Sequence, residues 1–187
     1  LEGNKIMKFT SSTDGTAEGT SQAELYHLRK FLEGTYAARV KLTNEPVTGQ
    51  DGDEIVQAFF TITPFAGDYD PDYAECDFEY LPNGGWGDPR SLFYVTTWDT
   101  YCVDPWDMIV ETKHFYDESY AGWHTLLCVI KDGKVSYYCD GRLLDTHSGA
   151  CYPQNKMAIH FNQWFIGGFT DSDRERSYVM AIDWVYH

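Results

Sequence analysis

Two Asp-Gly pairs, Asp132-Gly133 and Asp140-Gly141, stand between runs of residues that favour β-strands. An Asp-Gly pair supplies the positive φ angles of a tight two-residue turn, so it is the strongest short-range signal for a β-hairpin. The flanking runs at 123–130, 135–139 and 142–146 are therefore expected to form a three-stranded antiparallel meander.

The remaining chain also reads as short strands separated by turns. β-rich runs bounded by Gly, Pro or acidic residues occupy 35–42, 56–63, 74–81, 91–97, 156–164 and 178–186, and residues 25–32 favour an extended conformation. Turns every 8–12 residues, without an internal repeat or a long amphipathic helix, predict an all-β fold, an antiparallel β-sandwich of the jelly-roll kind. We expect residues 1–20, rich in Ser, Thr and Gly, to form an N-terminal arm or loop, and residues 21–187 to form a single β-sandwich domain.

Charge and composition restrict the partners. The chain has 14 basic and 29 acidic residues, a net charge of −15, which disfavours nucleic acid and anionic membranes. It contains no run of 18 apolar residues, so we expect no membrane span, and no signal peptide is apparent. Neutral glycans and divalent cations remain suitable partners, and aromatic residues, 17% of the chain, suit stacking on sugar rings. We expect a monomer.

The five cysteines form no CxxC pair, which argues against a zinc cage. An odd number leaves at least one cysteine unpaired within the chain. We expect mostly buried thiols, with one or two disulfides of a secreted protein as the alternative. The residues are Cys76, Cys102, Cys128, Cys139 and Cys151.

Glu75, Asp77 and Glu79 alternate along one predicted strand, so all three side chains share a face while Cys76 and Phe78 point to the core. The Cα atoms of the two glutamates would lie roughly 13 Å apart in a strand. On a curled sheet their side chains can lean toward the separation of about 5–5.5 Å used by retaining glycosidases. Neighbouring acids push their pKa values apart, which gives one ionised and one protonated carboxyl. A solvated acidic edge or a calcium loop remains the alternative interpretation.

The sequence 75–79, Glu-Cys-Asp-Phe-Glu, resembles the signature of glycoside hydrolase family 16, the clan of lichenases, laminarinases and xyloglucan endotransglycosylases. Four further segments resemble motifs of that family in the right order: 34–40, the hairpin 122–141, 160–164 and 181–185. The resemblance covers roughly residues 22–187 and implies a concanavalin A-like sandwich whose concave sheet forms a glycan cleft. The row of acids lacks the additional residue of laminarinases, so it is closer to the lichenase and transglycosylase branch. Tyr73 stands where lichenases carry a tryptophan of the cleft.

The resemblance also implies roles for individual residues. Glu75 would be the nucleophile, Asp77 the assisting acid and Glu79 the general acid/base, with no cofactor for catalysis. A structural calcium ion would be held by Asp183 and a backbone carbonyl near Gly34. The cleft would be lined by Asn162, Trp164, Trp98 and Glu24.

Other side chains have two interpretations each. His160 shares a face with Asn162 and Trp164, so it either touches the cleft or is a hydrogen-bonded core histidine. His124 is interpreted as structural. Tryptophans are more often core residues than sugar platforms, and both interpretations stay open for Trp86 and Trp106.

Three functions follow from this sequence. The first is a retaining, endo-acting hydrolase of β-linked, β-glucan-like polysaccharide that works by double displacement with paired glutamates. The second is a transglycosylase with the same residues, and the third is a non-catalytic carbohydrate-binding sandwich. The substrate is a polysaccharide or oligosaccharide in each case, and a secreted or extracellular location is expected.

Overall fold

The structure is a computed structural model that describes residues 5–49, 54–67, 70–100, 109–166 and 176–187. Within these residues the secondary structure is almost entirely β, with one short 3-10 helix, η1 (Gly149–Cys151). The strands are β1 (Met7–Thr13), β2 (Ala23–Phe31), β3 (Gly34–Leu42), β4 (Ile55–Ile62), β5 (Glu75–Leu81), β6 (Leu92–Trp98), β7 (Val110–Tyr116), β8 (Gly122–Lys131), β9 (Lys134–Cys139), β10 (Arg142–Ser148), β11 (Met157–Phe165) and β12 (Arg176–Tyr186).

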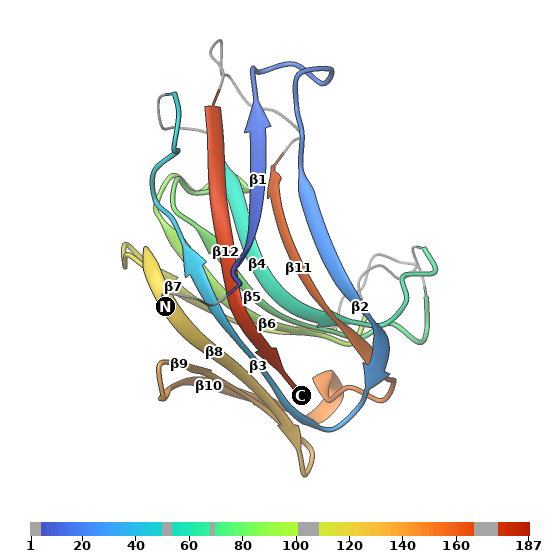
Figure 1. Cartoon of the computed structure of the whole chain (residues 1–187). Coiled ribbons are helices and arrows are strands. Elements are labelled where there is room, and N and C mark those ends of the chain that lie inside the picture. The colour runs from blue at the N-terminus through green and yellow to red at the C-terminus, as the bar shows by residue number, and fades with distance from the viewer. Residues whose placement is uncertain (1–4, 50–53, 68–69, 101–108, 167–175) are drawn as a thin grey trace.

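The strands form two curved antiparallel sheets that pack face to face (Figure 1). One sheet has the order β1-β12-β3-β8-β9-β10, and the other has the order β2-β11-β4-β5-β6-β7. The predicted all-β sandwich is therefore confirmed. In the second sheet β5 lies between β4 and β6, away from both edges. Pairing on both sides fixes the register of β5 relative to its two neighbours.

The core lies between the sheets and follows the period-2 alternation of the strands. On β5, Cys76, Phe78 and Tyr80 point inward and are at most 1% exposed. The Phe78 ring meets Tyr137 of the opposite sheet edge-on, with ring centroids 5.2 Å apart. The expectation of buried thiols is confirmed for the four described cysteines, which are buried and free: Cys76, Cys128, Cys139 and Cys151. Cys102 and Trp106 lie outside the described residues.

The two Asp-Gly hairpins are confirmed. Asp132 and Gly133 have φ angles of 52° and 75°, and Asp140 and Gly141 have φ angles of 50° and 81°. Positive φ at both positions is the geometry of a type I′ turn, whose twist matches that of the flanking strands. The turns join β8 to β9 and β9 to β10 as a meander.

The expectation that residues 1–20 form an N-terminal arm or loop is corrected, because residues 7–13 form strand β1, which pairs with β12. Phe9, Ser11 and Thr13 point inward and are at most 6% exposed, and the Ser11 hydroxyl donates to the Gln163 carbonyl across the core. The inward positions 11 and 13 carry small polar side chains, so the sequence of β1 shows no alternation of apolar and polar residues. Its threonines do favour a strand. Strand β7 was also not predicted, since it is an edge strand with largely exposed polar residues.

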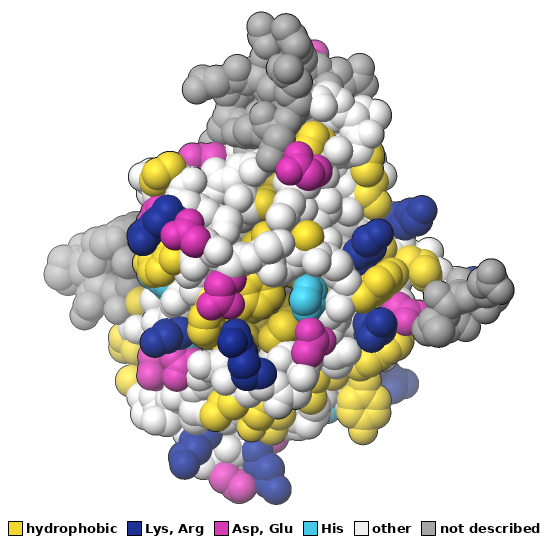
Figure 2. Space-filling model, turned by 90° about the vertical axis from the view of Figure 1, so that its left-hand side faces the viewer, with side chains coloured by type: hydrophobic (Ala, Val, Ile, Leu, Met, Phe, Trp, Pro, Cys, Tyr) yellow, Lys and Arg dark blue, Asp and Glu magenta, His cyan; other side chains and the backbone are white. Residues whose placement is uncertain are grey.

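Acidic, basic and hydrophobic side chains are interspersed on the side of the molecule shown in Figure 2. Among the described residues, no helix has the length and hydropathy required to cross a bilayer.

Candidate active site

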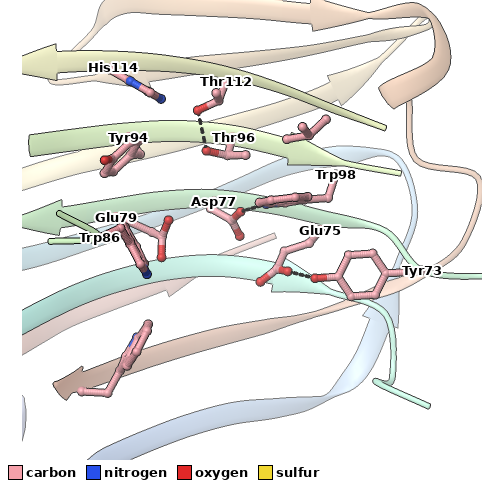
Figure 3. A pocket seen from close by; sticks show the side chains of 12 residues that line it. Tyr73, Glu75, Asp77, Glu79, Trp86, Tyr94, Thr96, Trp98, Thr112 and His114 are labelled. Atoms are coloured by element: carbon pink, nitrogen blue, oxygen red, sulfur yellow. Dashed lines mark hydrogen bonds between the residues drawn. The ribbon is translucent and has the colours of Figure 1, made fainter. Parts of the chain in front are cut away.

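Glu75, Asp77 and Glu79, here called the acid row, project from β5 on the concave face of the second sheet, opposite to the core residues of the same strand. Figure 3 shows the three carboxyl groups following one another along the strand and pointing into the same space. Asp77 is only 3% exposed, whereas Glu75 and Glu79 are partly exposed. The predicted shared face of the acids is therefore confirmed.

The acid row forms the floor of a cavity of about 560 Å³, here called the acid cavity. Trp86 packs against Tyr94 at 5.7 Å and against Trp164 at 6.3 Å between ring centroids, so aromatic rings enclose one end of the cavity, near Glu79. The other side chains that line it are Tyr73, Thr96, Trp98, Val110, Thr112 and His114.

Two hydrogen bonds fix the acid row. The Tyr73 hydroxyl donates to Oε2 of Glu75, and the indole N–H of Trp98 donates to Oδ2 of Asp77 over 3.0 Å (Figure 3). Trp98 is the cross-strand partner of Glu75 on β6, and its ring reaches diagonally to Asp77. Oδ1 of Asp77 is buried and has no hydrogen-bond partner within the described part of the chain.

The acids differ in how firmly they hold their protons. Burial, followed by the charge of Glu75, raises the pKa of Glu79 to about 8. Burial, followed by the charges of Glu75 and Glu79, raises the pKa of Asp77 well above its usual range. Burial also raises the pKa of Glu75, but the hydrogen bond from Tyr73 and, after it, the neighbouring Asp77 carboxyl oppose that rise. Glu75 is therefore the acid of the row whose anion is supported by a donor tyrosine, and its charge in turn helps to keep Asp77 and Glu79 protonated.

A second cavity of about 420 Å³ continues from Glu75 toward the edge strand β2 and is here called the edge cavity. Nδ1 of His160 lies 3.0 Å from Oε1 of Glu24, and the His160 ring stacks on Tyr26 with centroids 5.3 Å apart. Asn162 lines the same cavity. His160 therefore lies on the concave surface rather than in the core.

The structure thus divides the predicted site residues between two neighbouring cavities that share Glu75. The acid cavity contains Asp77, Glu79, Trp98 and Trp164, and the edge cavity contains Glu24, His160 and Asn162.

Sequence reasoning missed Tyr94, Thr112 and His114, and it noted Tyr73 only as a departure from the family pattern. Tyr94 could have been found, because 94, 96 and 98 alternate on β6 and pair with 79, 77 and 75 on β5. Thr112 and His114 come from β7, whose exposed polar sequence carried no strand signal. Tyr73 precedes β5, and only the folded structure brings its hydroxyl onto Glu75.

The predicted calcium residues do not come together. Asp183 lies at an irregularity of β12 beside Arg39, whose guanidinium is 3.6 Å from its carboxylate. Gly34 is five residues further along β3, roughly 17 Å away at the rise of a strand, and it lies against His187 instead. The Asp183 carboxylate is therefore neutralised by Arg39, and these two residues do not fit a shared calcium site.

Neither a protein-family model nor a curated protein matches the sequence, whereas solved structures do. A mixed-linkage glucan enzyme of glycoside hydrolase family 16 from Bacteroides ovatus, in complex with a product, is 14% identical. The match covers 100% of this chain and 82% of that chain, with a TM-score of 0.73. A β-1,3-1,4-glucanase (lichenase) from a mouse hindgut metagenome is 20% identical, with coverage of 96% and 78% and a TM-score of 0.66.

A κ-carrageenase from Zobellia galactanivorans is 12% identical, with coverage of 96% and 77% and a TM-score of 0.67. These structures share an architecture at low sequence identity, and their substrates differ. The likeness extends over nearly the whole of this chain. The chain therefore has the fold of the glycoside hydrolase family 16 β-glucanases.

Proposed function

We propose that the chain is a retaining, endo-acting glycoside hydrolase that cleaves β-linked polysaccharide of the β-glucan type at the acid row. The observation that carries this proposal is the unequal environment of Glu75 and Glu79 on one strand. One carboxyl has hydrogen-bond donors that stabilise its anion, and the other is held protonated near neutral pH. A nucleophile and a general acid require this difference.

In the first displacement Glu75 attacks the anomeric carbon while Glu79 gives its proton to the glycosidic oxygen. The bond to the leaving sugar breaks, and a covalent glycosyl ester forms on Glu75. Asp77, held by the Trp98 N–H, turns its protonated carboxyl toward Glu75. A neutral donor beside the nucleophile orients it and, with Tyr73, keeps it ionised without adding negative charge.

In the second displacement Glu79, now ionised, takes a proton from water that attacks the same anomeric carbon. The ester bond to Glu75 breaks, and two inversions give net retention of configuration. The aromatic rings of Trp86, Tyr94 and Trp164 line the acid cavity and offer stacking surfaces for sugar rings. Open cavities on both sides of Glu75 suit attack within a chain rather than at its end.

A substrate panel with mass spectrometry tests this proposal. Mixed-linkage β-glucan, laminarin, xyloglucan and κ-carrageenan are incubated with the protein, and the products are sized. We expect internal cleavage of a β-glucan and, with an activated 2-fluoro glycoside of the cleaved sugar, a covalent adduct on Glu75. Products longer than the starting oligosaccharides would indicate transglycosylation. Binding of these glycans without product or adduct would instead identify a non-catalytic binding domain.

A further inference from the structure

A cluster of three potential metal ligands lies apart from the acid row. It is at the open end of the β8–β9 hairpin, beside the turn that joins β9 to β10. Its members are His124 on β8, Cys139 at the end of β9 and Asp140 in the following turn. The cluster belongs to the first sheet, whereas the acid row lies on the concave face of the second sheet. The proposed glycosidase chemistry uses none of the three residues.

The donor atoms converge on one point. Nδ1 of His124 lies 2.7 Å from Oδ2 of Asp140 and 3.8 Å from Sγ of Cys139, and Sγ lies 3.9 Å from Oδ2. Bonds of about 2.0 Å to N or O and about 2.3 Å to S place the donors of tetrahedral zinc roughly 3.3–3.6 Å apart. Each observed separation is within about 0.6 Å of that range, so small side-chain rotations would complete three ligand positions.

Two hydrogen bonds to the backbone of Thr125 hold Asp140 in place. Asp140 has a φ of 50° in its turn, its N–H donates to the Thr125 carbonyl over 2.9 Å, and its Oδ1 accepts from the Thr125 N–H over 2.8 Å. Because Oδ1 of Asp140 is bound to the Thr125 N–H, the other carboxylate oxygen, Oδ2, is directed at His124. Carboxylates that bind metals are oriented by supporting hydrogen bonds of this kind.

We propose that His124, Cys139 and Asp140 form a binding site for a divalent ion of the zinc type, with water in the fourth position. Thiolate, imidazole and carboxylate together suit zinc rather than calcium or magnesium, which prefer oxygen ligands. Cys139 is 6% exposed and Asp140 is exposed, so the ion would sit at the rim of the core with access from solvent. The ion would join two strands and a turn, and its role would be to stabilise the hairpin.

The absence of a CxxC pair concealed this site in the sequence. One ligand comes from β8, and the other two come 15 and 16 residues later, from the last residue of β9 and the turn that follows it. Antiparallel pairing of β8 with β9 brings them together.

Cobalt is the probe for this proposal, because thiolate bound to Co²⁺ gives an intense charge-transfer band in the near ultraviolet and tetrahedral Co²⁺ absorbs strongly in the visible. The full chain, stripped of metal by chelator, is titrated with Co²⁺, and Zn²⁺ is then added to displace it. We expect both bands in the parent protein, their loss on adding Zn²⁺, and a higher Tm with Zn²⁺ by mass action.

Two variants and a matched control assign the site. Cys139→Ser should lose the charge-transfer band, and Asp140→Asn, a change at an exposed position, should weaken Zn²⁺ binding by at least about 10-fold. Cys151→Ser should retain both properties, since Cys151 is as buried as Cys139 at 6% but lies outside the cluster. The absence of a thiolate–cobalt band in the parent, or its persistence in Cys139→Ser, would overturn the proposal. Glycosidase activity does not enter this test.

Discussion

The acid cavity and the edge cavity lie side by side on one concave sheet and share Glu75, yet they are built differently. The acid cavity contains carboxyls with raised pKa values under a wall of aromatic rings. The edge cavity rests on β2, an edge strand that is mostly exposed, and Glu24 and His160 pair with each other there. Burial gives the first cavity reactive groups, whereas the second offers ordinary polar and aromatic contacts. We infer that the acid cavity performs the chemistry and that the edge cavity binds additional sugar units.

Replacing the shared residue should have the largest effect. Glu75→Gln removes the nucleophile but keeps its shape and a partner for the Tyr73 hydroxyl. Loss of a covalent nucleophile should lower kcat by roughly 10⁴-fold or more, with the fold and Tm preserved. The measurement is the rate of release of reducing ends from the substrate that the parent cleaves. Parent-like activity in this variant would show that β5 does not carry the catalytic site.

Glu79→Ala should be severe with polysaccharide but mild with a substrate whose leaving group needs no proton. Because burial raises the pKa of Glu79 to about 8, kcat/KM of the parent should fall above that pH as the general acid is lost. The variant, assayed with the activated substrate, should lack this decline. Added azide should restore turnover and give a glycosyl azide of retained configuration, since two displacements occur. An azide product of inverted configuration would mean that Glu79, not Glu75, is the nucleophile.

Tyr73→Phe should have a moderate effect that depends on pH. The variant removes the hydroxyl that donates to Glu75, so the pKa of Glu75 should rise further above its usual value. Since Glu75 must be ionised to attack, the acidic limb of the kcat/KM profile should shift to higher pH while the limb near pH 8 stays in place. Tyr94→Phe is the matched control in the same cavity, because no hydrogen bond joins Tyr94 to Glu75 in the described structure. Equal acidic limbs in Tyr73→Phe and the parent would rule out a positioning role for Tyr73.

The comparison of the cavities also shows what sequence could predict. Many short β-rich runs with regularly spaced turns, two of them Asp-Gly turns, were sufficient to predict the sandwich. Period-2 alternation on β5 was sufficient to predict the acid row, because both signals are local. Tyr73, Thr112 and His114 enter the acid cavity through side-chain orientation or the pairing of β7, which is an edge strand without an alternating pattern. The split of the cleft residues into two cavities, and the separation of Asp183 from Gly34, depend on cross-strand register, which no single segment encodes.

The smallest effect is expected in the edge cavity, where His160→Ala removes a ring that stacks on Tyr26 and lies 5.1 Å from Phe60. If this cavity only binds additional sugars, KM for long oligosaccharides should rise about 10-fold, a loss of about 1.4 kcal/mol of binding, with kcat nearly unchanged. Short activated substrates that occupy only the acid cavity should react as with the parent. Trp86→Ala is the contrasting variant, since Trp86 lies beside Glu79 and should affect long and short substrates alike. The ratio of kcat/KM for long and short substrates therefore distinguishes the cavities, and an equal loss on both substrates in His160→Ala would show that the edge cavity takes part in the chemistry.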